Sequence, residues 1–454
     1  MRELLKKTNA DYILNQMIFS SNMGKKYFQK IKKGLSFKEV EEQIQLTEKF
    51  FDLFEKEIII SIKSAISHIN DIENTLFHIN SKEVLDEIEM FEIKNFLYFS
   101  MRVQKKLNKE FNEIYFENPT DIFSILDPQN NELHSFFIYD EYSDKLKNIR
   151  NQKKEFQKNN LTENSEYIDI IKKEKEEEFK IKMDLTKKLK NHTTTLLEIF
   201  YKIAILDFLI AKSEIIEKYN LIKPILTNKI KLEKIFNPKV LDIHVSNKKR
   251  YQKIDFELED KPTIITGSNM SGKTLSTKTI ALIAVLLKLG FYVPAEKAEL
   301  KYFENIYYLS GDLGANDKGL SSYAGEIKYI NKAFIEAKNG NEILIILDEP
   351  ARTTNPKEGT AIIEALIDEL YSKKCSLLIT THYPNIIAEN AKKMRVKGLM
   401  REKISEINEK NINNFIDYSF IEDEKANIPE EAITIAEILG VDEEFIKTAR
   451  KFLG

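Results

Sequence analysis

Several kinds of residue are scarce in this sequence of 454 residues, and each scarcity excludes a class of protein. There is one cysteine, Cys375, so no disulfide can form within the chain, which indicates a reducing compartment. Because Cys375 adjoins the apolar run SLLIT, we interpret it as a small buried hydrophobic residue and not as a reactive thiol. No stretch reaches the roughly 18 apolar residues of a membrane span, and the N-terminus lacks the apolar segment of a signal peptide. We therefore expect a cytoplasmic protein without membrane contact.

An excess of charge of one sign is also lacking. Lysine and arginine number 69, aspartate and glutamate number 72, and the net charge is −3. This balance neither indicates nor excludes nucleic-acid binding, because local patches matter more than the sum. The hydrophobic share of 42% and the chain length predict two or three domains with substantial cores.

Glycine and proline are sparse before about residue 235, and apolar residues recur there at intervals of three and four, as in FFDLFEKEIIISIKSAISHI. That spacing is typical of helices. After residue 235, the short β-type runs TIITG, ILIILDE and SLLITTH alternate with helical stretches, which predicts a mostly parallel central sheet. The sequence thus predicts a helical core or lever region over 1–235 and an α/β domain over 236–425.

Two further segments have distinctive patterns. Lysine and glutamate dominate from about 140 to 190, and KNNLTENSE at 158–166 interrupts them, so we expect a projecting helical hairpin. Its arms would reach about 30 Å at 1.5 Å per residue, and a solvated or disordered charged segment is the alternative. The tail, 426–454, holds two short helical patterns, with Gly440 suited to a C-cap and Asp442 to an N-cap.

The stretch TIITGSNMSGKT, 263–274, follows the phosphate-binding pattern G-x-x-x-x-G-K-[ST] between a β run and a helical run. Backbone N–H groups of such a loop surround phosphate oxygens, and the helix N-terminus adds partial positive charge. Lys273 would reach the β- and γ-phosphates of ATP, and the Thr274 hydroxyl would bind Mg²⁺. The candidate nucleotide-binding residues are Gly267, Ser268, Asn269, Met270, Ser271, Gly272, Lys273 and Thr274.

The stretch ILDEPARTTNPKEG, 346–359, places two carboxylates at the end of an apolar strand, where uncompensated charge is costly. Asp348 would hold Mg²⁺, and Glu349 would orient and polarise the water that attacks the γ-phosphate. A third apolar run ends in TTHY, which predicts His382 at the same sheet edge as a γ-phosphate sensor; a structural histidine is the alternative. This order of motifs is the arrangement of ABC-type P-loop ATPases.

Five motifs in order, GSNMSGKT, GFYVPAEKAEL, GLSSYAGEI, DEPARTTNPKEG and TTHY, resemble those of the MutS family. The resemblance covers about 50–454 and is strongest from about 200. It implies a dimer, helical at its tail interface, in which Ser321 contacts the γ-phosphate bound by the partner subunit; helix capping by Ser321 and Ser322 is the alternative. It also implies supporting roles for Glu326 and Arg352, and a place beside adenine for Tyr251.

The resemblance has departures that bear on the partner. The Phe-x-Glu wedge of mismatch-detecting members has only a chance match, FNE at 111–113, so we expect the mismatch-reading domain, and likewise a C-terminal nuclease domain, to be absent. The loop ARTTNPKEG is similar to that of MutS-like proteins associated with cobalamin-dependent aminomutases.

Two hypotheses for the partner remain. A homodimer, or a heterodimer with a paralogue, hydrolyses ATP with Mg²⁺ to move its lever arms on DNA, or it remodels a protein client such as an aminomutase. A structural dimer that binds ATP without hydrolysis is less favoured, because Glu349 is present.

Overall fold

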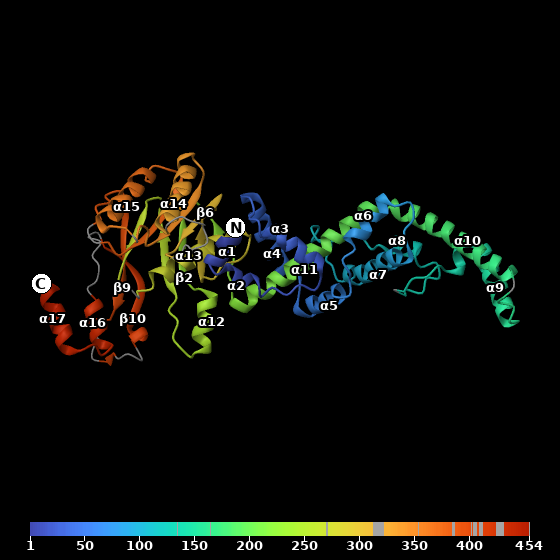
Figure 1. Cartoon of the computed structure of the whole chain (residues 1–454), viewed down its shortest axis with the longest axis horizontal. Coiled ribbons are helices and arrows are strands. Elements are labelled where there is room, and N and C mark those ends of the chain that lie inside the picture. Colours follow the sequence, from blue (N-terminus) through green and yellow to red (C-terminus); the bar gives the residue numbers. More distant parts are fainter. Residues whose placement is uncertain are drawn as a thin grey trace. The chain divides into compact units, whose positions relative to one another are not determined.

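The structure is a computed structural model of the chain. It describes residues 1–133, 135–163, 165–268, 271–311, 322–352, 354–383, 386–400, 402, 406–407, 412–423 and 431–453. The chain divides into two compact units (Figure 1). We call them the sheet unit (Met1–Met17, Lys32–Gln45 and Glu214–Gly454) and the helical unit (Ile18–Ile31 and Leu46–Ser213).

This division differs from the predicted boundary near residue 235. It falls after Ser213, within helix α11 (Thr193–Tyr219), and two N-terminal segments belong to the sheet unit. The Tyr12 hydroxyl donates a hydrogen bond to Asp242 Oδ2 at 2.6 Å, and Leu35 N–H donates one to the Lys288 carbonyl at 3.0 Å. Local periodicity carries no information about contacts over such separations, so the sequence could not assign these segments.

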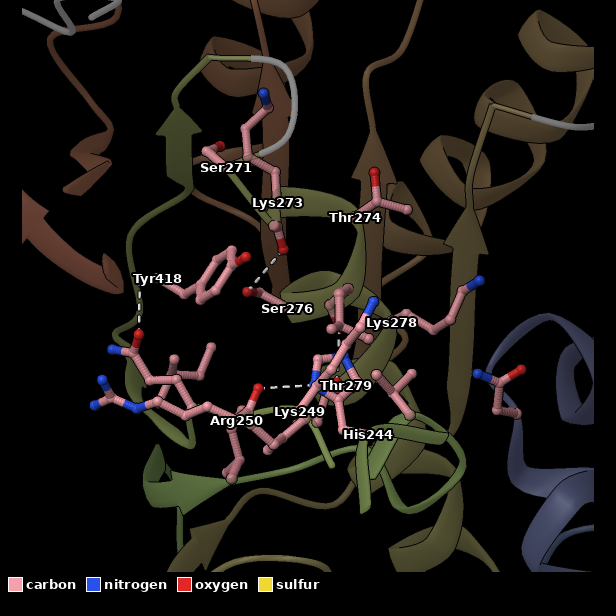
Figure 2. Close-up of a pocket in the computed structure, with 18 of the residues that line it drawn as sticks. His244, Lys249, Arg250, Ser271, Lys273, Thr274, Ser276, Lys278, Thr279 and Tyr418 are labelled. Atoms are coloured by element: carbon pink, nitrogen blue, oxygen red, sulfur yellow. Dashed lines mark hydrogen bonds between the residues drawn. The ribbon is translucent and has the colours of Figure 1, made fainter. Parts of the chain in front are cut away.

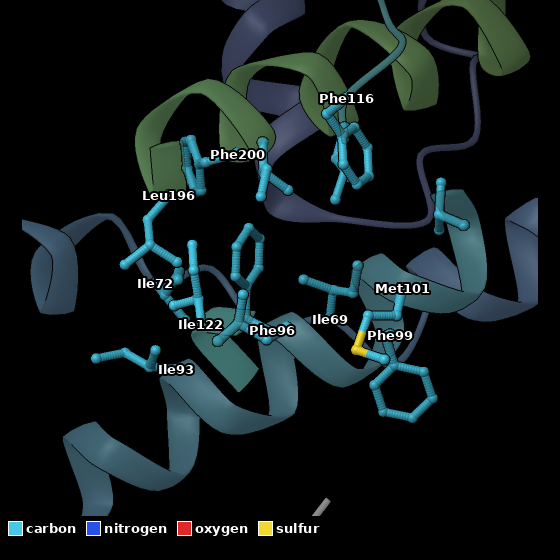
Figure 3. Close-up of a cluster of buried hydrophobic side chains, with 14 of the residues drawn as sticks. Ile69, Ile72, Ile93, Phe96, Phe99, Met101, Phe116, Ile122, Leu196 and Phe200 are labelled. Atoms are coloured by element: carbon cyan, nitrogen blue, oxygen red, sulfur yellow. The ribbon is translucent and has the colours of Figure 1, made fainter. Parts of the chain in front are cut away.

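The helical unit is built from helices that share an apolar core. It contains α3 (Asn22–Ile31), α5 (Lys56–Ile66), α6 (Glu73–Ser81), α7 (Glu87–Gln104), α8 (Thr120–Ile125), the 3-10 helix η1 (Asp140–Tyr142), α9 (Asp144–Lys158), α10 (Ser165–Lys190) and parts of α4 (Phe37–Leu53) and α11. Figure 3 shows Phe96 of α7 in the core with Leu196 and Phe200 of α11. Burying each such side chain contributes about 1.5–3 kcal/mol, which offsets the entropy of ordering the helices.

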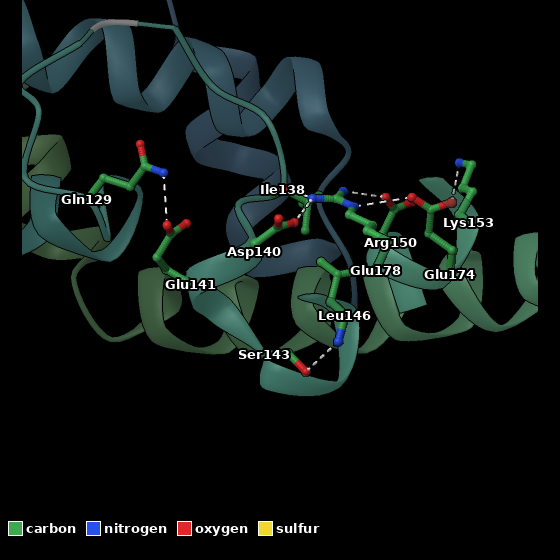
Figure 4. A network of polar contacts seen from close by, with 10 residues as sticks. All are labelled: Gln129, Ile138, Asp140, Glu141, Ser143, Leu146, Arg150, Lys153, Glu174 and Glu178. Carbon is green, nitrogen blue, oxygen red and sulfur yellow. Dashed lines mark hydrogen bonds and ion pairs between the residues drawn. The ribbon is translucent and has the colours of Figure 1, made fainter. Parts of the chain in front are cut away.

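Helices α9 and α10 pack together and lie on each side of the turn predicted at 158–166. Ser143 caps α9 by accepting a hydrogen bond from Leu146 N–H. Arg150 joins the two helices: its guanidinium donates to Asp140 at 2.6 Å, to Glu178 at 2.8 Å and to Glu174 at 3.1 Å (Figure 4). A rigid guanidinium fork suits several carboxylates at once, so this network fixes the base of the hairpin.

The sheet unit holds two sheets. The six-stranded sheet has the order β10 (Ile416–Glu422), β9 (Lys392–Leu399), β4 (Thr263–Thr266), β8 (Cys375–Thr381), β7 (Ile343–Asp348) and β6 (Asn305–Leu309). Neighbouring strands from β9 to β6 pair in parallel, and β10 is antiparallel at the edge. The other sheet has the order β1 (Ile225–Leu226), β5 (Lys297–Leu300), β2 (Ile230–Ile235) and β3 (Ile254–Leu258). The mixture of helices and strands agrees with the predicted fold class.

The remaining helices of the sheet unit are α1 (Arg2–Lys7), α2 (Ala10–Leu14), α12 (Pro238–Ser246), α13 (Lys273–Lys288), α14 (Ser322–Lys338), α15 (Pro356–Leu370), the 3-10 helix η3 (Ile412–Phe415), α16 (Ala432–Ile438) and α17 (Glu443–Leu453). Gly440 has a φ of +78° and Asp442 caps α17 by accepting from Phe445 N–H, as the sequence predicts. None of the helices that the structure describes has the length and hydropathy of a membrane span.

Strands β4, β7 and β8 are buried along their whole length, which explains their continuous apolar sequences. Parallel neighbours need a crossover between them, so their carboxyl ends meet at one edge of the sheet. At this edge Thr266 of β4 pairs with Thr381 of β8, and Asp348 of β7 pairs with Thr380 of β8. This edge positions the candidate site.

Candidate nucleotide site

Three motifs that are far apart in sequence meet at the carboxyl ends of these strands. The phosphate-binding loop follows β4, Glu349 follows β7, and His382 follows β8. The Lys273 Nζ lies 3.6 Å from Glu349 Oε1, and His382 Nδ1 lies 3.7 Å from Glu349 Oε2. The structure therefore brings together the three side chains that the sequence predicts to be catalytic.

Lys273 is buried at the start of α13. Its ammonium donates hydrogen bonds to the carbonyl oxygens of Gly267 at 2.7 Å and Ser268 at 3.0 Å. Burial lowers the pKa of Lys273, and the nearby carboxylates of Glu349 and Asp348 oppose that shift. The loop backbone therefore holds the Lys273 ammonium close to the Glu349 carboxylate.

Gly272, the N-cap of α13, has a φ of +83°, in the left-handed region that favours glycine. A Cβ atom there would lie 2.6 Å from Cδ1 of Tyr418, a residue of β10. The loop therefore needs glycine at this position for two reasons, its backbone conformation and the approach of the Tyr418 ring.

Asp348 is buried and accepts a hydrogen bond from the Thr380 hydroxyl at 2.6 Å. The backbone N–H of Glu349 donates to the carbonyl oxygen and to the hydroxyl of Thr380, each at 3.1 Å. Mg²⁺ prefers hard oxygen ligands and binds proteins through one or two carboxylates together with substrate phosphates. The Asp348 carboxylate and the Thr274 hydroxyl supply that chemistry, so the residues present fit the ion.

A cavity of about 630 Å³ adjoins these groups, within the usual range for small-molecule sites (Figure 2). The phosphate-binding loop and the end of β7 line it with Ser271, Gly272, Lys273, Thr274 and Glu349. Further lining residues are His244 of α12, then Lys249, Arg250 and Tyr251, and Tyr418 of β10, whose ring lies beside Gly272. The cavity wall therefore offers cationic side chains and aromatic rings as well as the groups of the loop.

Tyr251, which the resemblance places beside adenine, also lines the cavity. Its hydroxyl accepts a hydrogen bond from Asn237 N–H at 2.8 Å, and burial raises its pKa. The His244 ring meets it edge-on, with ring centroids 5.5 Å apart, and His244 Nδ1 lies 2.8 Å from the Arg250 carbonyl oxygen. These contacts fix the two rings in the cavity wall.

Sequence reasoning missed several residues of the site. Tyr418 and His244 line the cavity from segments without a recognised motif. Glu431 was also missed: its buried carboxylate accepts hydrogen bonds from the Ser268 hydroxyl at 2.6 Å and from Leu399 N–H at 2.8 Å. No local pattern marks Glu431, because its two partners lie 32 and 163 residues away in the chain.

Three predicted residues, Asn269, Met270 and Ser321, lie outside the described residues. Of the two predicted supporting residues, Arg352 reaches the Gly311 carbonyl oxygen at 3.4 Å, and Glu326 accepts a hydrogen bond from Ala351 N–H at 2.6 Å. Both therefore contact backbone beside the site and not the cavity itself.

Comparison with known proteins shows what this region is similar to. The family described as MutS domain V matches residues 263–454. These residues are similar to MutS domain V. The match begins at β4 and includes the phosphate-binding loop, Asp348, Glu349 and His382. The resemblance to the MutS family is thereby confirmed.

Curated MutS-family relatives match a longer part of the chain. Endonuclease MutS2 of Fusobacterium nucleatum is 31% identical over 297 residues, which cover 64% of this chain and 36% of that protein. Endonuclease MutS2 of Geobacillus sp. is 33% identical over 222 residues, covering 48% and 27%. DNA mismatch repair protein MutS of Exiguobacterium sp. is 31% identical over 241 residues, covering 50% and 28%. The chain thus spans 36% or less of the length of each of these relatives.

Proposed function

We propose that this chain binds ATP together with Mg²⁺ and hydrolyses it, and that it works as a dimer whose helical unit moves on a partner. One observation carries the proposal. Lys273 and His382 each lie within 4 Å of the Glu349 carboxylate, at the ends of three parallel strands and beside a cavity large enough for a nucleotide. A lysine in a glycine-rich loop facing a carboxylate at a strand end suits phosphoryl transfer to water.

Each side chain has a proposed role. Lys273 offsets the charge of the β- and γ-phosphates, and the backbone N–H groups at the start of α13 bind their oxygens. Thr274 and Asp348 would hold Mg²⁺, and the bound ion would offset the negative charge of the phosphates. Glu349 accepts a hydrogen bond from the attacking water and orients it, and His382 contacts the γ-phosphate. Removing a group that acts on the transition state lowers kcat more than it weakens binding.

We propose, from the family resemblance, that Ser321 completes the site of the partner subunit and that α16 and α17 take part in dimer contacts. DNA is the partner we favour, because relatives bear the names Endonuclease MutS2 and DNA mismatch repair protein MutS. A cytoplasmic location is supported by the single cysteine, Cys375.

The experiment is steady-state ATP turnover of the purified chain with and without Mg²⁺, compared with Lys273→Ala. Turnover that needs Mg²⁺ and falls by at least about a hundredfold in the variant supports the assignment, since that loss is about 2.7 kcal/mol of transition-state stabilisation. Full turnover in Lys273→Ala contradicts it. Lys332→Ala is the matched control, because Lys332 is an exposed lysine on α14 of the same unit and is not among the residues that line the cavity.

A further inference from the structure

The turn that follows β7 is strained. Glu349 has a φ of +53° and Ala351 a φ of +60°, and neither is glycine. For an L-residue with a side chain this region is unfavourable, because Cβ comes too close to the following carbonyl oxygen. Such a conformation persists only where the surroundings hold it, and it is concentrated at functional sites. The strain here lies at the proposed water-activating residue and two positions beyond it.

Two side chains from different elements hold the Ala351 peptide groups. The N–H of Ala351 donates to Glu326 Oε1 of α14 at 2.6 Å. Its carbonyl oxygen accepts from the hydroxyl of Tyr383, two residues after the end of β8, at 2.7 Å. Ala351 is 0% exposed, so no water can replace either partner. A buried polar group that loses its partner is costly, so losing either bond favours release of the strained turn.

The Tyr383 ring occupies a space that a glycine leaves open. A Cβ atom at Gly359 of α15 would lie 2.7 Å from the Tyr383 hydroxyl oxygen. Burial raises the pKa of Tyr383, so the hydroxyl keeps the proton that it donates to Ala351. Burial also raises the pKa of Glu326, which indicates that a neutral acceptor of the same shape suits this position.

The other end of the turn is fixed by a different contact. The N–H of Glu349 is bonded to Thr380, so the backbone on the strand side cannot rotate freely. Hydrogen bonds therefore hold the backbone at both ends of this short turn. The Glu349 carboxylate then lies 3.6 Å from the Lys273 ammonium.

We propose that Glu326 and Tyr383 are positioning residues, which hold Ala351 in the left-handed conformation and thereby aim the Glu349 carboxylate at the attacking water. The inference rests on the proposed ATPase function. Neither residue touches the nucleotide in this account, so both act on kcat through the orientation of Glu349. Misplacement of a reacting group by about 1 Å can cost about a hundredfold in rate.

The first test is Tyr383→Phe, which removes one hydroxyl and keeps the ring. We expect kcat to fall about tenfold, or about 1.4 kcal/mol, the value of one hydrogen bond, with KM and ATP affinity within about twofold of wild type. Tyr371→Phe, at the exposed end of α15, is the matched control and retains wild-type kcat.

The second test separates acceptor chemistry from packing at position 326. Glu326→Gln keeps an oxygen that can accept from Ala351 N–H, so it retains turnover within about threefold. Glu326→Met has a similar length without an acceptor, and its kcat falls about tenfold or more. Melting temperatures are measured for every variant, and kcat is compared where each is folded.

The outcomes are distinct. Wild-type kcat in Tyr383→Phe overturns the inference, and so does an equal loss in Glu326→Gln and Glu326→Met. A loss of ATP affinity as large as the loss of kcat also overturns it, since that indicates a structural effect on the binding site. If the wild-type chain has no turnover, the proposed function fails before any variant is made, and the positioning role falls with it.

Discussion

The buried ion pair of the helical unit gives the stability prediction with the best-defined magnitude. Lys94 Nζ of α7 lies 2.9 Å from Asp127 Oδ1, and their side chains are 0% and 1% exposed. Lys94 also donates to the Tyr139 hydroxyl at 3.0 Å, and Asp127 Oδ2 accepts from Glu132 N–H at 2.9 Å. The pair therefore joins three segments of the chain inside the apolar core.

Lys94→Met is the perturbation. It leaves the Asp127 carboxylate buried without its cation, and breaking such a pair typically costs about 3–5 kcal/mol. Asp127→Asn keeps an acceptor for Glu132 N–H but removes the negative charge, so Lys94 loses its counter-ion. In the double variant neither charge remains. Its destabilisation should therefore be smaller than the sum of the two single effects by at least about 2 kcal/mol.

The assay is urea unfolding followed by far-UV circular dichroism. The exposed pair of Lys49 and Glu113, whose nitrogen and oxygen lie 3.2 Å apart in the same unit, is the matched control. Lys49→Met should cost less than about 1 kcal/mol, because solvent screens that pair. Additive effects of the two buried substitutions, or a cost for Lys94→Met no larger than for Lys49→Met, would refute the reasoning.

Two further predictions concern the partner and the single cysteine. Duplex DNA should change the rate of ATP turnover at low salt, and the effect should fade as salt rises, because Lys and Arg contacts to phosphates release counterions; turnover indifferent to DNA at low salt would instead favour a protein client. Burial raises the pKa of Cys375 to about 11. The unfolded thiol loses its proton from about pH 8.5, so the folded state binds more protons between about 8.5 and 11, and the free energy of unfolding falls as pH rises through that window. Cys375→Ala should lose this contribution, at most about 1.4 kcal/mol per pH unit, and equal slopes in the two proteins would contradict the assignment.

The sequence was most informative where a local pattern has one structural meaning. The phosphate-binding loop between a strand and a helix, and the acids after an apolar run, could be placed at one sheet edge because the carboxyl ends of parallel strands meet. The side chains of Lys273, Glu349 and His382 lie there. The chemistry of these three side chains follows from their residue types, which can be read directly from one sequence.

Other features depend on contacts that no local pattern encodes. The segments Met1–Met17 and Lys32–Gln45 belong to the sheet unit, although their helical periodicity resembles that of the helical unit. Glu431 contacts the phosphate-binding loop from 163 residues away in the chain. The sign of φ at Ala351 is set by Glu326 and Tyr383, and alanine itself gives no sign of a left-handed turn.

The central claim is that Glu349 activates water in a site that binds ATP through Lys273. The most direct measurement is the comparison of wild type and Glu349→Gln, with Mg²⁺-dependent ATP binding measured by calorimetry and turnover by phosphate release. We expect turnover in wild type, and in Glu349→Gln an ATP affinity within about threefold of wild type with turnover lower by at least about a hundredfold. Glu349→Gln turnover equal to that of wild type would contradict it.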